Sequence, residues 1–440
     1  MKIGIPYLDR ILPLEFPEEN LLAIAEPKDV TGVPSFSGAV LAEALERPYG
    51  ITADGARRDG GEAGQSLAEF LEGGKRILVI INDATRPTPT AAMLAALMPA
   101  FRKAGVPNKS LTLLVATGAH RAPTEDEYRQ ILGGLYGELR GRAVHHDARK
   151  DGDMVELGNT RNGTPILLNR RIFEADRVIA TGSVEPHYFA GFTGGRKAFL
   201  PGVAAYRSIA ENHKRALSEA ARSLALEGNP VHEDMMDALP LIKTPVFSLM
   251  AVLDKEQRTA AAASGDIMAS FYAAVEKARQ IFCVPVAAKA DIVVSVAKFP
   301  MDIDLYQSQK AIDNGAAALK DGGVLILVSS CRDGIGDESY AKLLSQAASP
   351  VDAIDRIHAG YRLGYHKAAK MAAVSARATV MAVTELSPER LAGMFIESAA
   401  SPQAALDNAL ARLREQGIMR PKILILPDGC VTVPDVNPQG

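Results

Sequence analysis

Short apolar runs alternate with longer amphipathic segments early in the chain. The run RILVII at 76–81 is followed by TAAMLAALMPAFRKAG at 90–105 and then by SLTLLVATG at 110–118. Apolar runs of this length between turn residues are typical of buried strands, and the segment between them has helical spacing. The order strand, helix, strand predicts parallel β-α-β units.

The same rhythm continues to residue 253. The segments RVIATG at 177–182 and VFSLMAVL at 246–253 have the character of buried strands, with a helical pattern at 204–224 between them. A similar unit begins near residue 290, where DIVVSVA at 291–297 and VLILVSS at 324–330 flank a helical pattern at 306–320. The chain therefore repeats the β-α-β order in two separate regions.

These patterns predict an α/β fold with two doubly wound, Rossmann-like domains and a cleft between them. We expect an N-terminal domain over residues 1–280 and a C-terminal domain over 285–420, with the boundary between about 275 and 290. Residues 421–440 contain the strand KILILPDG, which could join either sheet, and a tail.

Charge and apolar content narrow the class of partner. The formal net charge of −3 comes from interspersed acidic and basic residues, without a long run of either sign. This pattern predicts neither a nucleic-acid surface nor an anionic-membrane surface, and it favours a small-molecule partner. No apolar run approaches the length needed to span a membrane, and the first residues lack the apolar stretch of a secretory signal.

The three cysteines indicate a reducing compartment. Cys283, Cys331 and Cys430 are scattered and show no Cys-x-x-Cys spacing, which argues against a disulfide framework or a thiolate metal site. We therefore expect a soluble, cytoplasmic protein.

The loops that follow the predicted strands hold the candidate chemistry, because ligands of open α/β sheets bind beyond the carboxyl ends of the strands. The loop at 82–90 contains Asp83 and Arg86, and we expect a helix opened by Pro89 and capped by Thr88. Arg86 at a sheet edge suits a carboxylate or a phosphate. Taken alone, this loop is better explained as a surface arginine beside a helix cap.

A histidine lies in the second loop, at 116–127. Gly118 permits a tight turn before His120, and Thr124 with Glu127 has the spacing of a capping box. His120 is placed like a catalytic base, although an isolated loop histidine is more often simply solvated.

The third loop, at 181–202, combines His187, five glycines and Lys197. The stretch is too irregular for a helix or a strand, and Gly194 and Gly195 suit close approach of the backbone to a ligand. It is not a Walker A loop, because no serine or threonine follows Lys197, and it lacks the Gly-x-Gly-x-x-Gly order. A flexible surface turn explains the glycines but not the residues around them.

Two predicted helices add further candidates. His213 would project from a rigid helix and could bind a metal, although an isolated helical histidine is more often exposed or satisfied. Gln307 and Lys310 lie one turn apart on one face of the helix at 306–320 and could bind a carboxylate, although ordinary surface polarity explains them equally well.

Taken together, six elements resemble the lactate racemase family, and they occur in that family's order. They are Asp-x-Thr-Arg-Pro (83–87), Ala-Thr-Gly-x-His-Arg (116–121), Glu-Pro-His (185–187), Gly-Gly-x-Lys-x-x-x-Pro-Gly (194–202), His213 and Gln-x-x-Lys (307–310). Six coincident elements are far more specific than any one of them.

The resemblance implies a 2-hydroxyacid racemase or epimerase with a nickel pincer nucleotide, which is a nicotinate-derived mononucleotide joined to a lysine through a thioamide. Lys197 matches that lysine, His213 matches the protein ligand of nickel, and His120 and His187 match the two acid/base residues. The remaining positions match either substrate-binding or cofactor-binding residues. Tyr306, Tyr188 and Phe189 are candidates for lining the pocket of the substrate side chain. The substrate set is Arg86, Gln307, Lys310 and Tyr306, and the cofactor set is Asp83, Thr85, Gly194 and Gly195.

The implied chemistry explains why two histidines are needed. One takes the hydroxyl proton while hydride passes to the cofactor, which gives a planar 2-oxoacid that can accept hydride on either face. The resemblance also implies that cofactor-synthesis enzymes are partners. Lactate, longer aliphatic or aromatic hydroxyacids, malate and sugar acids all remain possible substrates.

Two functions from other classes stay open. A metal-dependent hydrolase could use His120, His187 and His213 as three ligands, but it leaves Lys197 and its glycines unexplained. A non-catalytic hydroxyacid-binding homologue would not need both histidines and the lysine.

Overall fold

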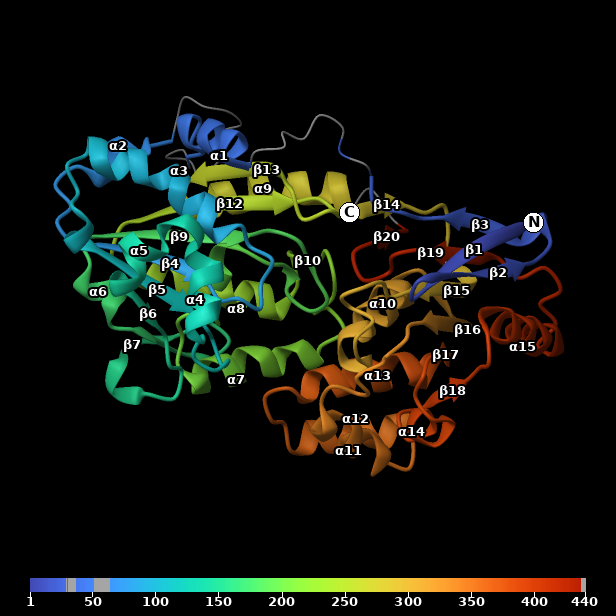
Figure 1. Ribbon diagram of the computed structural model, residues 1–440. Coiled ribbons are helices and arrows are strands. Elements are labelled where there is room, and N and C mark those ends of the chain that lie inside the picture. The colour runs from blue at the N-terminus through green and yellow to red at the C-terminus, as the bar shows by residue number, and fades with distance from the viewer. Residues whose placement is uncertain (29, 31–36, 51–63, 437–440) are drawn as a thin grey trace. The chain divides into compact units, whose positions relative to one another are not determined.

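The computed structural model describes residues 1–28, 30, 37–50 and 64–436 (Figure 1). The chain forms two compact units. One, called here the central unit, consists of Asp29–Ile281, and the other, called the terminal unit, consists of Met1–Lys28 together with Phe282–Gly440. Each is built on a sheet of mainly or entirely parallel strands with helices, as the apolar pattern predicts.

The sheet of the central unit has the strand order β13-β12-β9-β4-β5-β6. All neighbouring pairs are parallel except β13, which runs antiparallel to β12. The strands are β4 (Ile77–Asn82), β5 (Leu111–Ala116), β6 (Ala143–His145), β9 (Arg177–Ser183), β12 (Val246–Leu253) and β13 (Thr259–Gly265). Five of the six residues of β4 are buried, because a central parallel strand is covered on both faces.

Helices connect these strands. They are α1 (Ser37–Glu46), α2 (Leu67–Leu71), α3 (Thr90–Lys103), α4 (Glu125–Leu132), α5 (Tyr136–Leu139), α6 (Arg171–Glu174), α7 (Tyr206–Lys214), α8 (Pro230–Ala238) and α9 (Ile267–Phe282). The helix expected at 204–224 is shorter than its pattern indicates. It ends at Lys214, and the next residue, Arg215, donates hydrogen bonds to Asn162 O and Thr164 Oγ1, so contacts with a distant loop replace continued helix.

The sheet of the terminal unit is entirely parallel, with the order β18-β17-β16-β15-β19-β3. Its strands are β3 (Leu21–Ile24), β15 (Ala290–Val296), β16 (Leu319–Val328), β17 (Thr379–Val383), β18 (Ile396–Ser398) and β19 (Ile423–Leu426). Its helices are α10 (Leu305–Ala317), α11 (Glu338–Ser345), α12 (Pro350–Ala359), α13 (Tyr365–Arg377), α14 (Pro388–Ala392) and α15 (Pro402–Glu415). The strand expected near 422 is β19, which lies inside this sheet, whereas residues 437–440 of the expected tail lie outside the described residues.

The amino-terminal segment differs from the expected domain of residues 1–280. Residues 1–28 fold with the terminal unit, where β1 (Lys2–Tyr7) and β2 (Arg10–Glu15) form a hairpin and β3 pairs with β19. Ile5, Leu14 and Phe16 are buried in the core of that unit. The pairing satisfies the open edge of β19, and the local apolar pattern carries no signal for so distant a partner.

Among the described residues, no helix combines the length and apolarity that crossing a membrane requires.

Candidate active site

Three loops of the central unit meet at one edge of its sheet. The strands β9, β4 and β5 are neighbours and run parallel, so their carboxyl ends lie together (Figure 1). The loop after β5 is joined to the loop after β9 by the hydrogen bond from Gly118 N to Gly202 O (2.9 Å). Gly118 has φ +54°, which is the positive φ that its predicted turn requires.

The loop after β4 is joined to the end of β9 through Thr88. Its Oγ1 lies 3.0 Å from Ser183 Oγ. The expected cap of α3 by Thr88 is therefore wrong, because the helix begins at Thr90 and the Thr88 hydroxyl binds the neighbouring strand instead. The predicted capping box of Thr124 and Glu127 at the start of α4 is confirmed.

His120 contacts a buried carboxylate. Its Nδ1 lies 2.7 Å from Asp83 Oδ2, and the hydroxyl of Thr85 donates to Asp83 Oδ1 over 2.7 Å. The Asp83 side chain is 6% exposed and that of His120 is 48% exposed, so the ring is held at its Nδ1 side while the rest of it stays open. Burial would raise the pKa of Asp83, but the hydrogen bonds from His120 and Thr85 outweigh it and hold this pKa below its usual value.

A small hairpin carries His187. Strands β10 (Pro186–His187) and β11 (Gly191–Phe192) pair within the loop that was expected to be irregular. The backbone N–H groups of Ala190 and Phe189 donate to His187 Nδ1 over 3.3 and 3.5 Å. On the other side of the ring, His187 Nε2 lies 3.5 Å from Lys197 Nζ.

Lys197 follows the two glycines on a 3-10 turn, Gly195–Ala198, and its side chain is half-buried. Burial and the neighbouring positive charges of Arg86 and Arg196 hold the pKa of Lys197 well below its usual value. A lysine amine with a lowered pKa loses its proton more readily, and the uncharged form is the one that reacts as a nucleophile.

Gly194 and Gly195 are required by packing within the chain. Both have positive φ, +80° and +53°. A Cβ on Gly194 would lie 2.5 Å from Val184 Cγ2, and one on Gly195 would lie 2.8 Å from three side-chain atoms of Phe271. The two glycines therefore let the Lys197 turn pack closely against Val184 and Phe271. This packing accounts for both glycines without a ligand.

Phe189 links Lys197, His187 and His213. Its buried ring makes edge contacts with His187 (4.5 Å between centroids) and with His213 on α7 (5.1 Å), and Lys197 Nζ lies 5.3 Å from its centroid. The sequence thus separates these groups by up to 26 positions, but the fold gathers them around one aromatic ring.

Arg86 supplies a positive charge at the same edge. Its field lowers the pKa of both Asp83 and Lys197. In the part of the chain that the structure describes, its guanidinium forms neither a side-chain hydrogen bond nor an ion pair, so its donors remain available for an anion.

Gln307, Lys310 and Tyr306 belong to the other unit, on α10. Asp304 caps this helix by accepting from Gln307 N over 2.7 Å. The amine of the buried Lys367 on α13 lies 3.7 Å from the centroid of the Tyr306 ring and donates to the Tyr306 carbonyl. Sequence reasoning missed Lys367, and no local signal marks a residue whose contact lies 61 positions away.

The donor set fits the cofactor that the resemblance implies. A half-buried amine with a lowered pKa suits covalent attachment. An imidazole on a rigid helix, such as that of His213, suits a late first-row metal like nickel. By contrast, the described residues contain no group of three His, Cys, Asp or Glu side chains able to hold a metal ion, which gives the three-histidine hydrolase no support.

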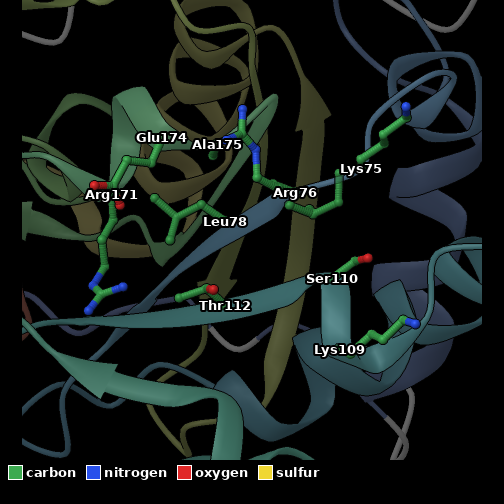
Figure 2. Close-up of a pocket in the computed structure, with 10 residues that line it drawn as sticks. Lys75, Arg76, Leu78, Lys109, Ser110, Thr112, Arg171, Glu174 and Ala175 are labelled. Atoms are coloured by element: carbon green, nitrogen blue, oxygen red, sulfur yellow. The ribbon is translucent and has the colours of Figure 1, made fainter.

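A separate pocket of about 400 Å³ lies at the opposite end of the same sheet. Figure 2 shows Lys109, Ser110 and Thr112 around the amino end of β5, together with Arg76 and Arg171. None of the candidate site residues lines this pocket, because they follow the carboxyl ends of the strands.

Models of two protein domains match most of the chain. The lactate racemase N-terminal domain matches residues 7–224, and the lactate racemase C-terminal domain matches residues 286–433. A lactate racemase of Thermoanaerobacterium thermosaccharolyticum is 34% identical over 81% of this chain and 80% of its own length. Another, from Lactiplantibacillus plantarum, is 30% identical over 97% of this chain and 98% of its own length.

Solved structures agree with these matches. The lactate racemase apoprotein of Thermoanaerobacterium thermosaccharolyticum superposes with a TM-score of 0.87 at 31% identity, covering 99% of this chain and 100% of that one. A protein from Thermotoga maritima has a TM-score of 0.61 at 18% identity over 84% of this chain and 96% of its own, and this likeness concerns the fold alone.

Proposed function

Because this chain belongs to the lactate racemase family and is therefore an isomerase, we propose that it racemises lactate or a closely related 2-hydroxyacid with a nickel pincer nucleotide attached to Lys197. The observation that carries this proposal is the gathering of Lys197, His187 and His213 around the ring of Phe189. One amine for attachment, one imidazole for the metal and one for proton transfer are then present in a single place.

Lys197 is the attachment point, and the lowered pKa of its amine supports that role. His213, held on α7, is the protein ligand of the metal. When bound, such a nucleotide supplies a hydride acceptor and donor for the carbon that bears the hydroxyl group.

His120 and His187 move the hydroxyl proton. Asp83 holds the His120 ring by its Nδ1 and would stabilise the imidazolium that forms when Nε2 accepts a proton. Asp83 therefore acts on the substrate through His120, which is a different role from the cofactor contact that the resemblance implied for it. Thr85 in turn orients Asp83.

The substrate carboxylate is bound by cations and amide donors. Arg86 has its donors available at the same sheet edge as His120, and Gln307 and Lys310 share one face of α10. We propose that these three hold the carboxylate and hydroxyl groups during turnover, with Tyr306, Tyr188 and Phe189 next to the remainder of the substrate.

The test is a chiral assay of protein produced together with cofactor-synthesis enzymes. D- and L-lactate, malate and an aromatic 2-hydroxyacid are supplied separately, and formation of the opposite enantiomer is measured. Intact mass of wild type and of Lys197→Ala reports attachment. We expect racemisation and a mass increment in wild type and neither in the variant. A loaded protein that racemises none of these acids would overturn the proposal.

A further inference from the structure

The two candidate acid/base histidines use the same ring nitrogen for opposite kinds of partner. His120 presents Nδ1 to the carboxylate of Asp83 at 2.7 Å. His187 presents Nδ1 to the backbone N–H groups of Ala190 at 3.3 Å and Phe189 at 3.5 Å. A carboxylate only accepts hydrogen bonds and a backbone N–H only donates them, so each contact fixes where the ring hydrogen lies.

For His120, the hydrogen must lie on Nδ1. Asp83 is ionised, and its Oδ2 needs a donor at 2.7 Å. The hydroxyl of Thr85 gives its own hydrogen to Asp83 Oδ1, so its oxygen, 3.4 Å from His120 Nδ1, also faces the ring as an acceptor. In the neutral ring, Nε2 therefore has a lone pair and is ready to accept a proton.

For His187, the hydrogen must lie on Nε2. Two N–H groups point at Nδ1, and a hydrogen there would face both of them. Nε2 is on the other side of the ring, 3.5 Å from Lys197 Nζ. The backbone contacts at Nδ1 therefore set the tautomer.

We propose that Asp83 and the backbone N–H of Ala190 are positioning groups that hold the two histidines in opposite tautomers, His120 with an accepting Nε2 and His187 with a donating Nε2. The catalytic meaning of this difference rests on the proposed function. The tautomers themselves do not, because they follow from contacts of the chain alone.

The consequence is a resting state that is prepared for one direction. A substrate hydroxyl beside His120 can transfer its proton to Nε2 at once, which gives an imidazolium paired with Asp83. A hydroxyl beside His187 meets an Nε2 that already carries hydrogen, so this ring must first change tautomer and move its Nδ1 away from the N–H of Ala190. Because the two enantiomers of a racemisation have equal free energies, kcat/KM is the same in both directions, and the difference is confined to the separate kcat and KM values and to the first turnover.

Ring-nitrogen NMR of the apoprotein tests the assignment directly. Protein labelled with 15N in histidine is measured at a pH more than one unit above the ordinary histidine pKa of about 6.5. Signals are assigned with His120→Gln and His187→Gln. We expect a protonated Nδ1 and a bare Nε2 for His120, and the reverse pattern for His187. The same tautomer in both rings would overturn the proposal.

Variants separate the positioning groups from general structural effects. Asp83→Asn should release His120 toward a mixture of tautomers and leave His187 unchanged, whereas Asp126→Asn, at a carboxylate that is 98% exposed, should change neither. Lys197→Met should leave the His187 tautomer unchanged, because the backbone sets it. His120 signals that are unchanged in Asp83→Asn would contradict the role of Asp83. His187 signals that change in Lys197→Met would contradict the role of the Ala190 backbone N–H. Since no cofactor is used, a failure of racemisation in loaded protein would count against the proposed function and not against the tautomers.

Discussion

Asp83 Oδ2 lies 2.7 Å from His120 Nδ1, with the aspartate side chain 6% exposed and the histidine side chain 48% exposed. A buried carboxylate thus holds an accessible imidazole by one nitrogen. This relationship connects the loops after β4 and β5, and it gives the first prediction its direction.

Asp83→Asn should lower kcat of the loaded enzyme by about 10- to 100-fold, by analogy with the loss of orienting carboxylates behind other histidines. An amide neither fixes the His120 tautomer nor stabilises its imidazolium. His120→Ala removes the proton acceptor and should cost more, about 10²- to 10⁴-fold. Steady-state kinetics in both directions provide the measurement, and equal activities of Asp83→Asn and wild type would contradict the role given to this carboxylate.

Nickel retention should separate His213 from the acid/base pair. His213→Ala should lose most of the metal on gel filtration in dilute buffer, because it removes a ligand that a helix holds in position. His120→Ala should retain it. Metal analysis of the folded fractions measures both, with intact mass as a control for attachment at Lys197. Equal nickel in the two variants would contradict the ligand assignment.

Lys197 should destabilise the apoprotein, and the effect should depend on pH. The pKa of Lys197 is lower in the folded protein than in the unfolded chain. Between these two pKa values the unfolded chain binds the proton and the folded protein does not. The free energy of unfolding therefore falls as the pH drops from the unfolded pKa to the folded pKa. Lys197→Met should therefore raise Tm at pH 7, by about 2–4 °C for each 1 kcal/mol of relieved cost, and the gain should shrink toward pH 10. Lys103→Met, at an exposed lysine, should show no such trend. A pH-independent difference for Lys197→Met would show that its amine is not perturbed.

Gly194→Ala should destabilise the fold more than Gly73→Ala. Both glycines have positive φ, +80° and +72°, so both substitutions carry a backbone strain of about 1 kcal/mol. Only at Gly194 would the new Cβ also clash, 2.5 Å from Val184 Cγ2, whereas nothing lies within 4 Å at Gly73. Urea denaturation of the two apoproteins measures the difference, and we expect about 1–3 kcal/mol in addition at Gly194. Equal losses would show that Val184 yields freely.

Lys310→Met should raise KM for the hydroxyacid by about 10-fold or more with a smaller change in kcat, because a charged hydrogen bond to the carboxylate contributes about 1.5–3 kcal/mol in the bound states. Lys289→Met, at an exposed lysine just before the amino end of β15, is the control. A variant with unchanged KM would remove Lys310 from the carboxylate site.

The apolar pattern determined most of the fold within each unit. Buried parallel strands such as β4 and β15 need continuous apolar residues on both faces, so the local sequence is sufficient to predict where they lie. The capping box of Thr124 and Glu127 is equally local, because both partners lie within one turn. The six family motifs similarly identified the lactate racemase family without any coordinates.

Tertiary structure decided what depends on distant partners. The pairing of β3 with β19 joins residues about 400 positions apart. The Thr88 hydroxyl forms a hydrogen bond with Ser183 instead of capping the helix that follows it. The sequence determined that Asp83, His120, His187 and Lys197 exist in loops after strands. Only the fold decided which nitrogen of each ring faces which group, because hydrogen bonds depend on distances and directions of a few tenths of an ångström that no local pattern encodes.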